Sequence, residues 1–160
     1  MSVDEDVNKE LENAGKEFSG LKVLIVDDEA VVRRVLPRVL KAQMNRTGYE
    51  IVTFPNGLEA LDYLEQEGGV AVLISDYRMP IMLGPELLMK VSQAYPETTR
   101  VMMSGTDSEP ANGLADYFFP KPFDNEMVKA TVRVALEDYV GRKKGDGDES
   151  RADGDVLRSA

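Results

Sequence analysis

Short apolar runs alternate along the chain with segments in which apolar residues recur every three or four positions. The runs are rich in β-branched, Met or aromatic residues, which is typical of strands buried on both faces of a sheet. They cover residues 21–26, 49–54, 70–75, 100–104 and 117–119. Helical periodicity lies between and after them, in residues 32–44, 58–64, 86–91 and from about 124 to 139. Strands that alternate with helices predict an α/β fold whose parallel sheet is covered on both faces.

Individual residues refine the helix boundaries. Asn56 precedes one helical segment and is suited to cap its first turn, and Pro85 suits the first turn of the next. Pro37 falls inside the first helical segment, where it removes a backbone donor and predicts a kink.

Polar residues follow most of the predicted strands where they end. In open parallel sheets, ligands bind beyond the carboxyl ends of the strands, so these side chains are expected to converge on one edge. Clustered carboxylates need a compensating cation, and Mg²⁺ suits them because it accepts carboxylates while leaving positions for phosphate oxygens. An Asp beside that ion can act as a nucleophile toward phosphorus, with Lys and Ser as donors to the phosphoryl oxygens. The residues concerned are Asp27, Asp28, Glu29, Asp76, Ser104 and Lys121.

Each of these residues also has a purely structural interpretation. Asp28 could cap the first helix, and Asp76 could belong to a turn. Ser104 is an ordinary strand-end residue, and Lys121 before Pro122 could be a solvated side chain at a turn. The functional interpretation rests on all of them falling at successive strand ends in the right order.

Composition narrows the class of protein. The 160 residues carry a net charge of −10 and contain neither Cys nor His. The acidic balance argues against binding to nucleic acid or to an anionic membrane. Disulfides, thiolate chemistry, imidazole metal sites and Ser-His-Asp triads are excluded, and the lack of Cys fits a reducing compartment. Without a signal peptide or an apolar run long enough to span a bilayer, a cytoplasmic protein is expected.

Charge and glycine content divide the chain into three parts. Residues 1–20 are acidic and are expected to form a flexible extension, and residues 142–160 are glycine-rich and charged, which predicts a disordered tail. The alternating pattern fills residues 21–141, which we expect to form one domain.

Four motifs together resemble the signatures of response-regulator receiver domains. They are VLIVDDE (23–29), LISDYRMP (73–80), MMSG (102–105) and FFPKPF (118–123), and the resemblance spans about 120 residues. By this resemblance Asp76 is the phosphoacceptor, Asp27 and Asp28 are the acidic pair that holds Mg²⁺, and the backbone carbonyl of Arg78 is a further metal ligand. Ser104 and Lys121 correspond to the residues that contact the phosphoryl group, and Phe118 corresponds to the aromatic switch position.

The resemblance implies a doubly wound, five-stranded flavodoxin-like fold with a cis Lys121–Pro122 bond. It also implies a histidine kinase or phosphotransfer protein as the source of the phosphoryl group. One departure concerns the segment between Ser104 and Lys121, which is about a helical turn shorter than usual. Because residues 105–115 contain Gly, Pro and Asn, the family's fourth helix is expected to be short or missing.

The preferred hypothesis is a stand-alone response regulator that signals by phosphorylation-controlled binding to an unidentified protein target. Only about 20 residues follow the last predicted helix, too few for an output domain. Such a switch is not an enzyme beyond its own phosphorylation and dephosphorylation, and it can be a monomer or a phosphorylation-dependent dimer. The alternative is a receiver-like docking module that acts independently of phosphorylation. An Asp-nucleophile phosphatase is disfavoured because Asp76 is followed by Tyr77-Arg78, without the DxD arrangement of those enzymes.

Overall fold

The structure is a computed structural model that describes residues 5–7, 17–105 and 113–145. Five strands form one sheet in the order β2-β1-β3-β4-β5, and every neighbouring pair is parallel. The strands are β1 (Lys22–Val26), β2 (Glu50–Phe54), β3 (Val72–Asp76), β4 (Thr99–Ser104) and β5 (Tyr117–Pro120). The predicted α/β class and the doubly wound five-stranded sheet are therefore confirmed.

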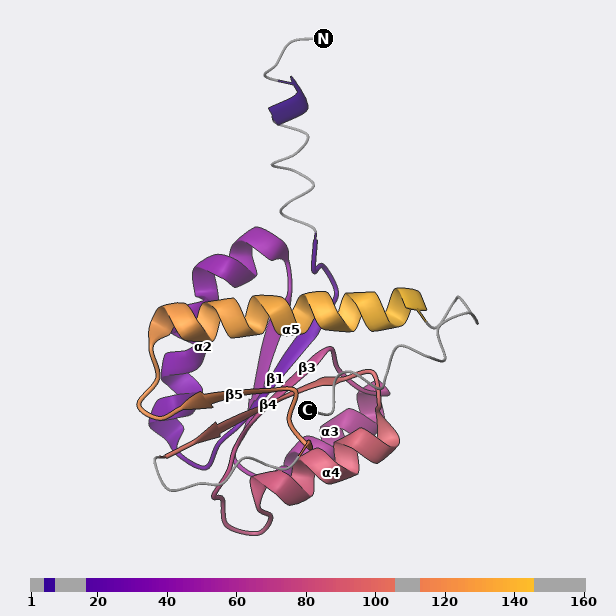
Figure 1. Cartoon of the computed structure of the whole chain (residues 1–160). Helices are drawn as coiled ribbons and strands as arrows, with labels where there is room; N and C mark the ends of the chain where they lie inside the picture. Colours follow the sequence, from indigo (N-terminus) through magenta and orange to yellow (C-terminus); the bar gives the residue numbers. More distant parts are fainter. Residues whose placement is uncertain (1–4, 8–16, 106–112, 146–160) are drawn as a thin grey trace.

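Helices cover both faces of this sheet. They are α2 (Ala30–Thr47), α3 (Gly57–Glu67), α4 (Gly84–Ala94) and α5 (Asn125–Gly145). Figure 1 shows α2 and α5 on one face and α3 and α4 on the other. Within the described ranges, no helix combines the length and the apolar character needed to cross a bilayer.

Alternation along the central strand β1 builds the two halves of the core. Val23 and Ile25 pack with the helices α2 and α5, whereas Leu24 and Val26 pack with α3 and α4. All four side chains are fully buried. A strand with helices on both faces must be apolar on both faces, because successive side chains point in opposite directions. This requirement explains the uninterrupted apolar run in the sequence.

The predicted helix signals are partly confirmed. The Asn56 side chain accepts a hydrogen bond from the Glu59 N–H at 2.9 Å and caps α3, and Pro85 lies in the first turn of α4. Pro37 lies inside α2 without ending that helix. Between β4 and β5, the described residues 105 and 113–116 contain no helix, and residues 106–112 lie outside the described part of the chain.

Both expected domain boundaries differ from the structure. The tail was expected from residue 142, but α5 continues to Gly145, because Arg142 donates to the Glu97 carbonyl and to Thr99 Oγ1. The flexible extension was expected to reach residue 20, but Phe18 is buried and its N–H donates to the Thr47 carbonyl at 2.8 Å. An aromatic side chain that fills the core outweighs the polar character of its neighbours. Most of residues 1–16 and all of 146–160 lie outside the described residues.

One glycine allows the chain to pass close to the end of β3. A Cβ built on Gly84 would lie 2.2 Å from the backbone oxygen of Asp76. Such an approach is open only to a residue without a side chain, so Gly84 brings the start of α4 directly against the residue that ends β3.

Replacing Gly84 therefore tests this contact. We expect Gly84→Ala to lower the free energy of unfolding by about 3 kcal/mol, because backbone atoms must move apart to admit the methyl group. Gly141→Ala is the matched control. Gly141 lies in α5, and apart from its neighbours in that helix no atom of the described residues lies within 4 Å of the added Cβ, so the variant should gain about 0.5–1 kcal/mol of stability. Urea unfolding of both variants measures the difference, and equal stabilities would contradict the close contact.

Candidate functional site

Three carboxylates meet where two neighbouring strands end. Asp27 and Asp28 follow β1, and Asp76 is the last residue of β3, the strand beside it. One carboxylate oxygen from each of the three residues lies within 4.8 Å of the others. Asp27 and Asp76 are buried and Asp28 is exposed, so the cluster opens to solvent on one side.

Hydrogen bonds fix the buried carboxylate and its backbone. Asp27 Oδ1 accepts the N–H of Glu29 at 2.9 Å. The Arg33 guanidinium, from the first turns of α2, donates to the Asp27 carbonyl at 2.8 Å. The loop after β1 is thereby held in place by α2, the helix that follows it. The sequence reasoning missed this contribution of Arg33, since an Arg in a helical segment carries no local sign of the carbonyl it will contact.

Lys121 supplies the positive charge. Its Nζ lies 2.7 Å from Asp27 Oδ2, 3.2 Å from Asp76 Oδ1 and 3.8 Å from Glu29 Oε1. The Lys121 N–H also donates to the Ser104 carbonyl at 2.7 Å, and the Lys121–Pro122 peptide bond is cis, as the resemblance implied. A side chain from the end of β5 thus crosses the sheet edge to join carboxylates at β1 and β3.

Burial and two neighbouring charges shift the pKa of the buried Asp76 carboxyl. Burial raises the pKa of Asp76, and the neighbouring Asp27 carboxylate raises it further, while Lys121 opposes both. For Lys121 itself burial lowers the pKa, but its bonds to Asp27 and Asp76 outweigh this effect and leave the pKa raised. The ammonium therefore stays protonated and holds the cluster together.

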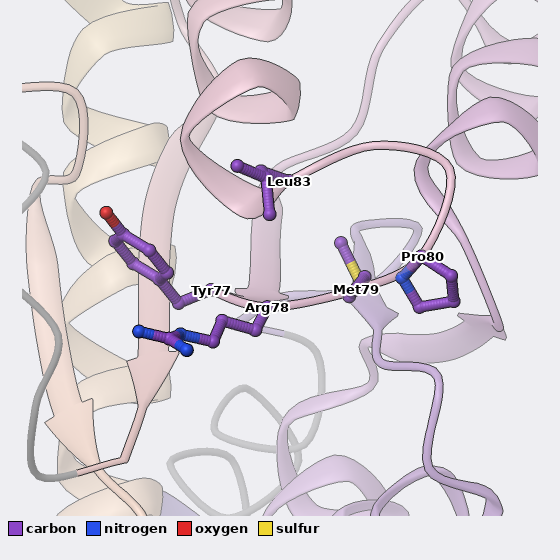
Figure 2. Close-up of a pocket in the computed structure, with 5 residues that line it drawn as sticks. All are labelled: Tyr77, Arg78, Met79, Pro80 and Leu83. Carbon is purple, nitrogen blue, oxygen red and sulfur yellow. The ribbon is translucent and has the colours of Figure 1, made fainter.

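Three further residues were predicted to belong to the site, namely Ser104, Phe118 and Arg78. Ser104 is fully buried at the end of β4, and its hydroxyl donates to the Gly105 carbonyl at 3.2 Å rather than to the carboxylates. Phe118 on β5 is 46% exposed. The side chain of Arg78 projects from the loop between β3 and α4, as Figure 2 shows, and is exposed.

The donor set suits a hard divalent cation. Two of the carboxylates are in place on adjacent strand ends, the third is open to solvent, and Mg²⁺ takes oxygen ligands while keeping several waters. A cation at this position would relieve the repulsion that Lys121 balances in its absence. The three aspartates could therefore hold Mg²⁺.

Comparisons with known proteins identify the family. The model of the response regulator receiver domain matches residues 23–133. A chemotaxis protein CheY homolog of Campylobacter jejuni is 32% identical over 135 residues, which cover 79% of this chain and 98% of that protein. The sensor kinase CckA of Brucella abortus is 35% identical over 81% of this chain, but the match covers only 14% of the kinase.

Solved structures agree with this assignment. The chemotaxis response regulator CheY4 of Vibrio cholerae is 31% identical, with a TM-score of 0.62, over 72% of this chain and 98% of that one. An uncharacterized protein from Neptuniibacter caesariensis is 33% identical, with a TM-score of 0.72, over 79% and 95%. A parallel five-stranded sheet with an acidic pocket at its edge defines the class of receiver folds. The chain belongs to the response regulator receiver domain family of two-component systems.

Family membership carries several general properties. Receiver domains are signalling switches that interact with histidine kinases, and they bind Mg²⁺ at an acidic pocket. The chain spans 14% of the sensor kinase and 25% of the transcriptional regulator NtrC of Escherichia coli, which is also a relative.

Replacing the Lys121 ammonium by a neutral side chain tests the balance of charges at this site. Lys121→Met leaves Asp27 and Asp76 without their partner, and we expect a loss of about 2 kcal/mol of stability near neutral pH. Lys121 lowers the pKa of Asp76, so removing it raises that pKa further above the unfolded value; protonation then favours the folded state, and the loss should shrink as the pH is lowered. Mg²⁺ should also restore stability, since it binds the folded cluster.

Lys129→Met provides the control for this variant. Lys129 is half-buried in α5, and its ammonium pairs with the exposed Glu126 at 3.2 Å, so its removal should change stability by less than about 0.5 kcal/mol. Denaturant unfolding at several pH values, with and without Mg²⁺, measures both variants. A Lys121→Met protein as stable as wild type, and insensitive to Mg²⁺, would contradict the charge balance described above.

Proposed function

We propose that this chain is a phosphorylation-controlled switch whose Asp76 accepts a phosphoryl group from a histidine kinase or phosphotransfer protein. One observation carries the proposal: Lys121 bridges Asp27 and Asp76 beside the open carboxylate of Asp28. In this arrangement the Asp76 carboxylate, the proposed nucleophile, lies next to the Lys121 ammonium, and carboxylate oxygens are in place to bind Mg²⁺ as a second cation.

Each residue of the site has a defined part in the proposed reaction. A carboxylate oxygen of Asp76 forms the new bond to phosphorus as the P–N bond of the partner's phosphohistidine breaks, and the imidazole leaves with the electron pair. Asp27, Asp28, Asp76 and the carbonyl of Arg78 would hold Mg²⁺, which stabilises negative charge on the transferred oxygens. The Lys121 ammonium donates to those oxygens.

The readout of the switch involves two further residues. A phosphoryl group on Asp76 would add strong acceptor oxygens near the end of β4, where the Ser104 hydroxyl donates to the Gly105 carbonyl. Ser104 would turn toward that group, and the half-exposed Phe118 on β5 would rearrange with it. The resulting change of surface would control binding to a protein target.

We also propose that the chain acts as a single receiver domain rather than through an attached output domain. The match to the Campylobacter jejuni CheY homolog, which extends over 98% of that protein, supports this reading. DNA binding is not part of the proposal, because the net charge of −10 disfavours contact with phosphates.

A phosphorylation assay tests the acceptor. Wild type incubated with Mg²⁺ and a small-molecule phosphodonor should gain one phosphoryl group by intact mass, and Asp76→Asn should gain none. Asp62→Asn is the matched control, because Asp62 is an exposed carboxylate on α3 away from the strand ends. An adduct that survives in Asp76→Asn, or that is lost in Asp62→Asn, would show that Asp76 is not the acceptor.

A second candidate function is a docking module that acts independently of phosphorylation. It is favoured by one observation: residues 105 and 113–116, the described part of the β4–β5 connection, contain no helix. Equal binding of a captured target by wild type and Asp76→Asn, with or without phosphodonor, would support this function over the switch.

A further inference from the structure

The loop between β3 and α4 forms a surface depression beside the phosphoacceptor. It has a volume of about 460 Å³ and is lined by Tyr77, Arg78, Met79, Pro80 and Leu83. Figure 2 shows Tyr77 and Arg78 on one side, Met79 and Pro80 on the other, and Leu83 at the start of the helix above them. The lining is apolar except for the Tyr77 hydroxyl and the Arg78 guanidinium.

Ile81, the residue after Pro80, adopts a backbone conformation that its side chain disfavours. Its φ is +75°, in the left-handed region, and its side chain is 68% exposed. A β-branched residue at positive φ is strained, and glycine or asparagine would adopt this conformation at lower cost. Because the exposed side chain gains little from packing, the fold by itself gives no reason for isoleucine here.

Leu83, in the same loop, stands at a helix N-cap, a position that favours polar residues. It occupies the N-cap position of α4, where its side chain accepts no hydrogen bond from the helix, and it is 51% exposed. Ser, Thr, Asp or Asn would satisfy a backbone N–H at this position. Two neighbouring positions thus expose large apolar side chains where polar or small residues would stabilise the chain. Departures of this kind are expected where a surface serves binding.

Arg78 adds a specific charge to this apolar surface. Its side chain is exposed and forms no hydrogen bond or ion pair with any residue in the described ranges. In a chain of net charge −10, a guanidinium that has no partner among the described residues and lies beside an apolar depression favours an acidic occupant.

We propose that this depression is a docking site for a segment of a partner protein that presents an apolar side chain next to a carboxylate. The apolar group would enter between Met79 and Leu83, and the carboxylate would pair with Arg78 at the rim. The site is joined to the phosphoacceptor, because the Gly84 N–H donates to the Tyr77 carbonyl at 2.8 Å and the Tyr77 N–H donates to Asp76 Oδ1 at 3.0 Å. The proposal goes beyond the switch proposed above, and its test requires no phosphorylation.

A small apolar acid can serve as the probe for this chemistry. We would titrate 3-phenylpropionate into the full chain labelled with ¹³C at its methionine methyl groups, and use 3-phenylpropionamide as the uncharged control. The acid should shift the Met79 methyl signal and bind about threefold more tightly than the amide, and Arg78→Gln should remove this difference. Equal affinity for acid and amide in wild type, or shifts away from Met79, would overturn the proposal.

Stability measurements separate a binding role from a role in the fold. Ile81→Gly and Leu83→Asn should each raise the melting temperature by about 3 °C, because one relieves strain and the other caps α4. Leu83→Asn should also weaken binding of 3-phenylpropionate. If both variants lost stability, the exposed side chains would serve the fold, and the proposal would fail. Concentration-dependent dimerisation of wild type that Leu83→Asn abolishes would instead identify a second copy of this chain as the occupant.

Discussion

Repulsion among three carboxylates is the constraint on which the functional edge of this structure depends. Asp27, Asp28 and Asp76 bring oxygens within 4.8 Å of one another, and two of these side chains are buried. Burial and the neighbouring Asp27 carboxylate both raise the pKa of Asp76 and disfavour its ionised form. Lys121 offsets that repulsion from the other side of the sheet edge, at 2.7 Å from Asp27 and 3.2 Å from Asp76. Lys121 lowers the pKa of Asp76 and so opposes the effects of burial and of Asp27 on that carboxyl.

The sheet order makes this arrangement possible. Because β1 lies between β2 and β3, the residues that follow β1 are adjacent to the last residue of β3. The edge strand β5 pairs with β4, so the loop after it can carry Lys121 over the end of β4 to the carboxylates. Gly84 then places the start of α4 against the backbone of Asp76. The site is a product of the strand order and of one close backbone contact, and its parts lie in segments that are distant in the sequence.

The loop after β3 differs from the cluster of carboxylates and Lys121 described above. At the acidic cluster Lys121 offsets the repulsion, whereas Ile81 and Leu83 each replace a residue type that would stabilise the same backbone. Natural sequences give up local stability most often where a surface has another task. The receiver fold is shared with many relatives, so we infer that what is particular to this chain lies in such loops more than in the acidic pocket.

The sequence by itself determined the class of fold and the residues of the acidic pocket. Apolar runs such as residues 21–26, alternating with helical segments, are typical of strands buried between two layers of helices, and a parallel sheet brings the strand ends together. The order of the strands, the bridge formed by Lys121 and the brace from Arg33 to the Asp27 carbonyl were decided only in the tertiary structure. So were the burial of Phe18 and the extension of α5 through Arg142, which depend on partners far along the chain. Periodicity reports which face of an element is apolar, but a contact between distant residues depends on the packing of the whole chain, which no local pattern contains.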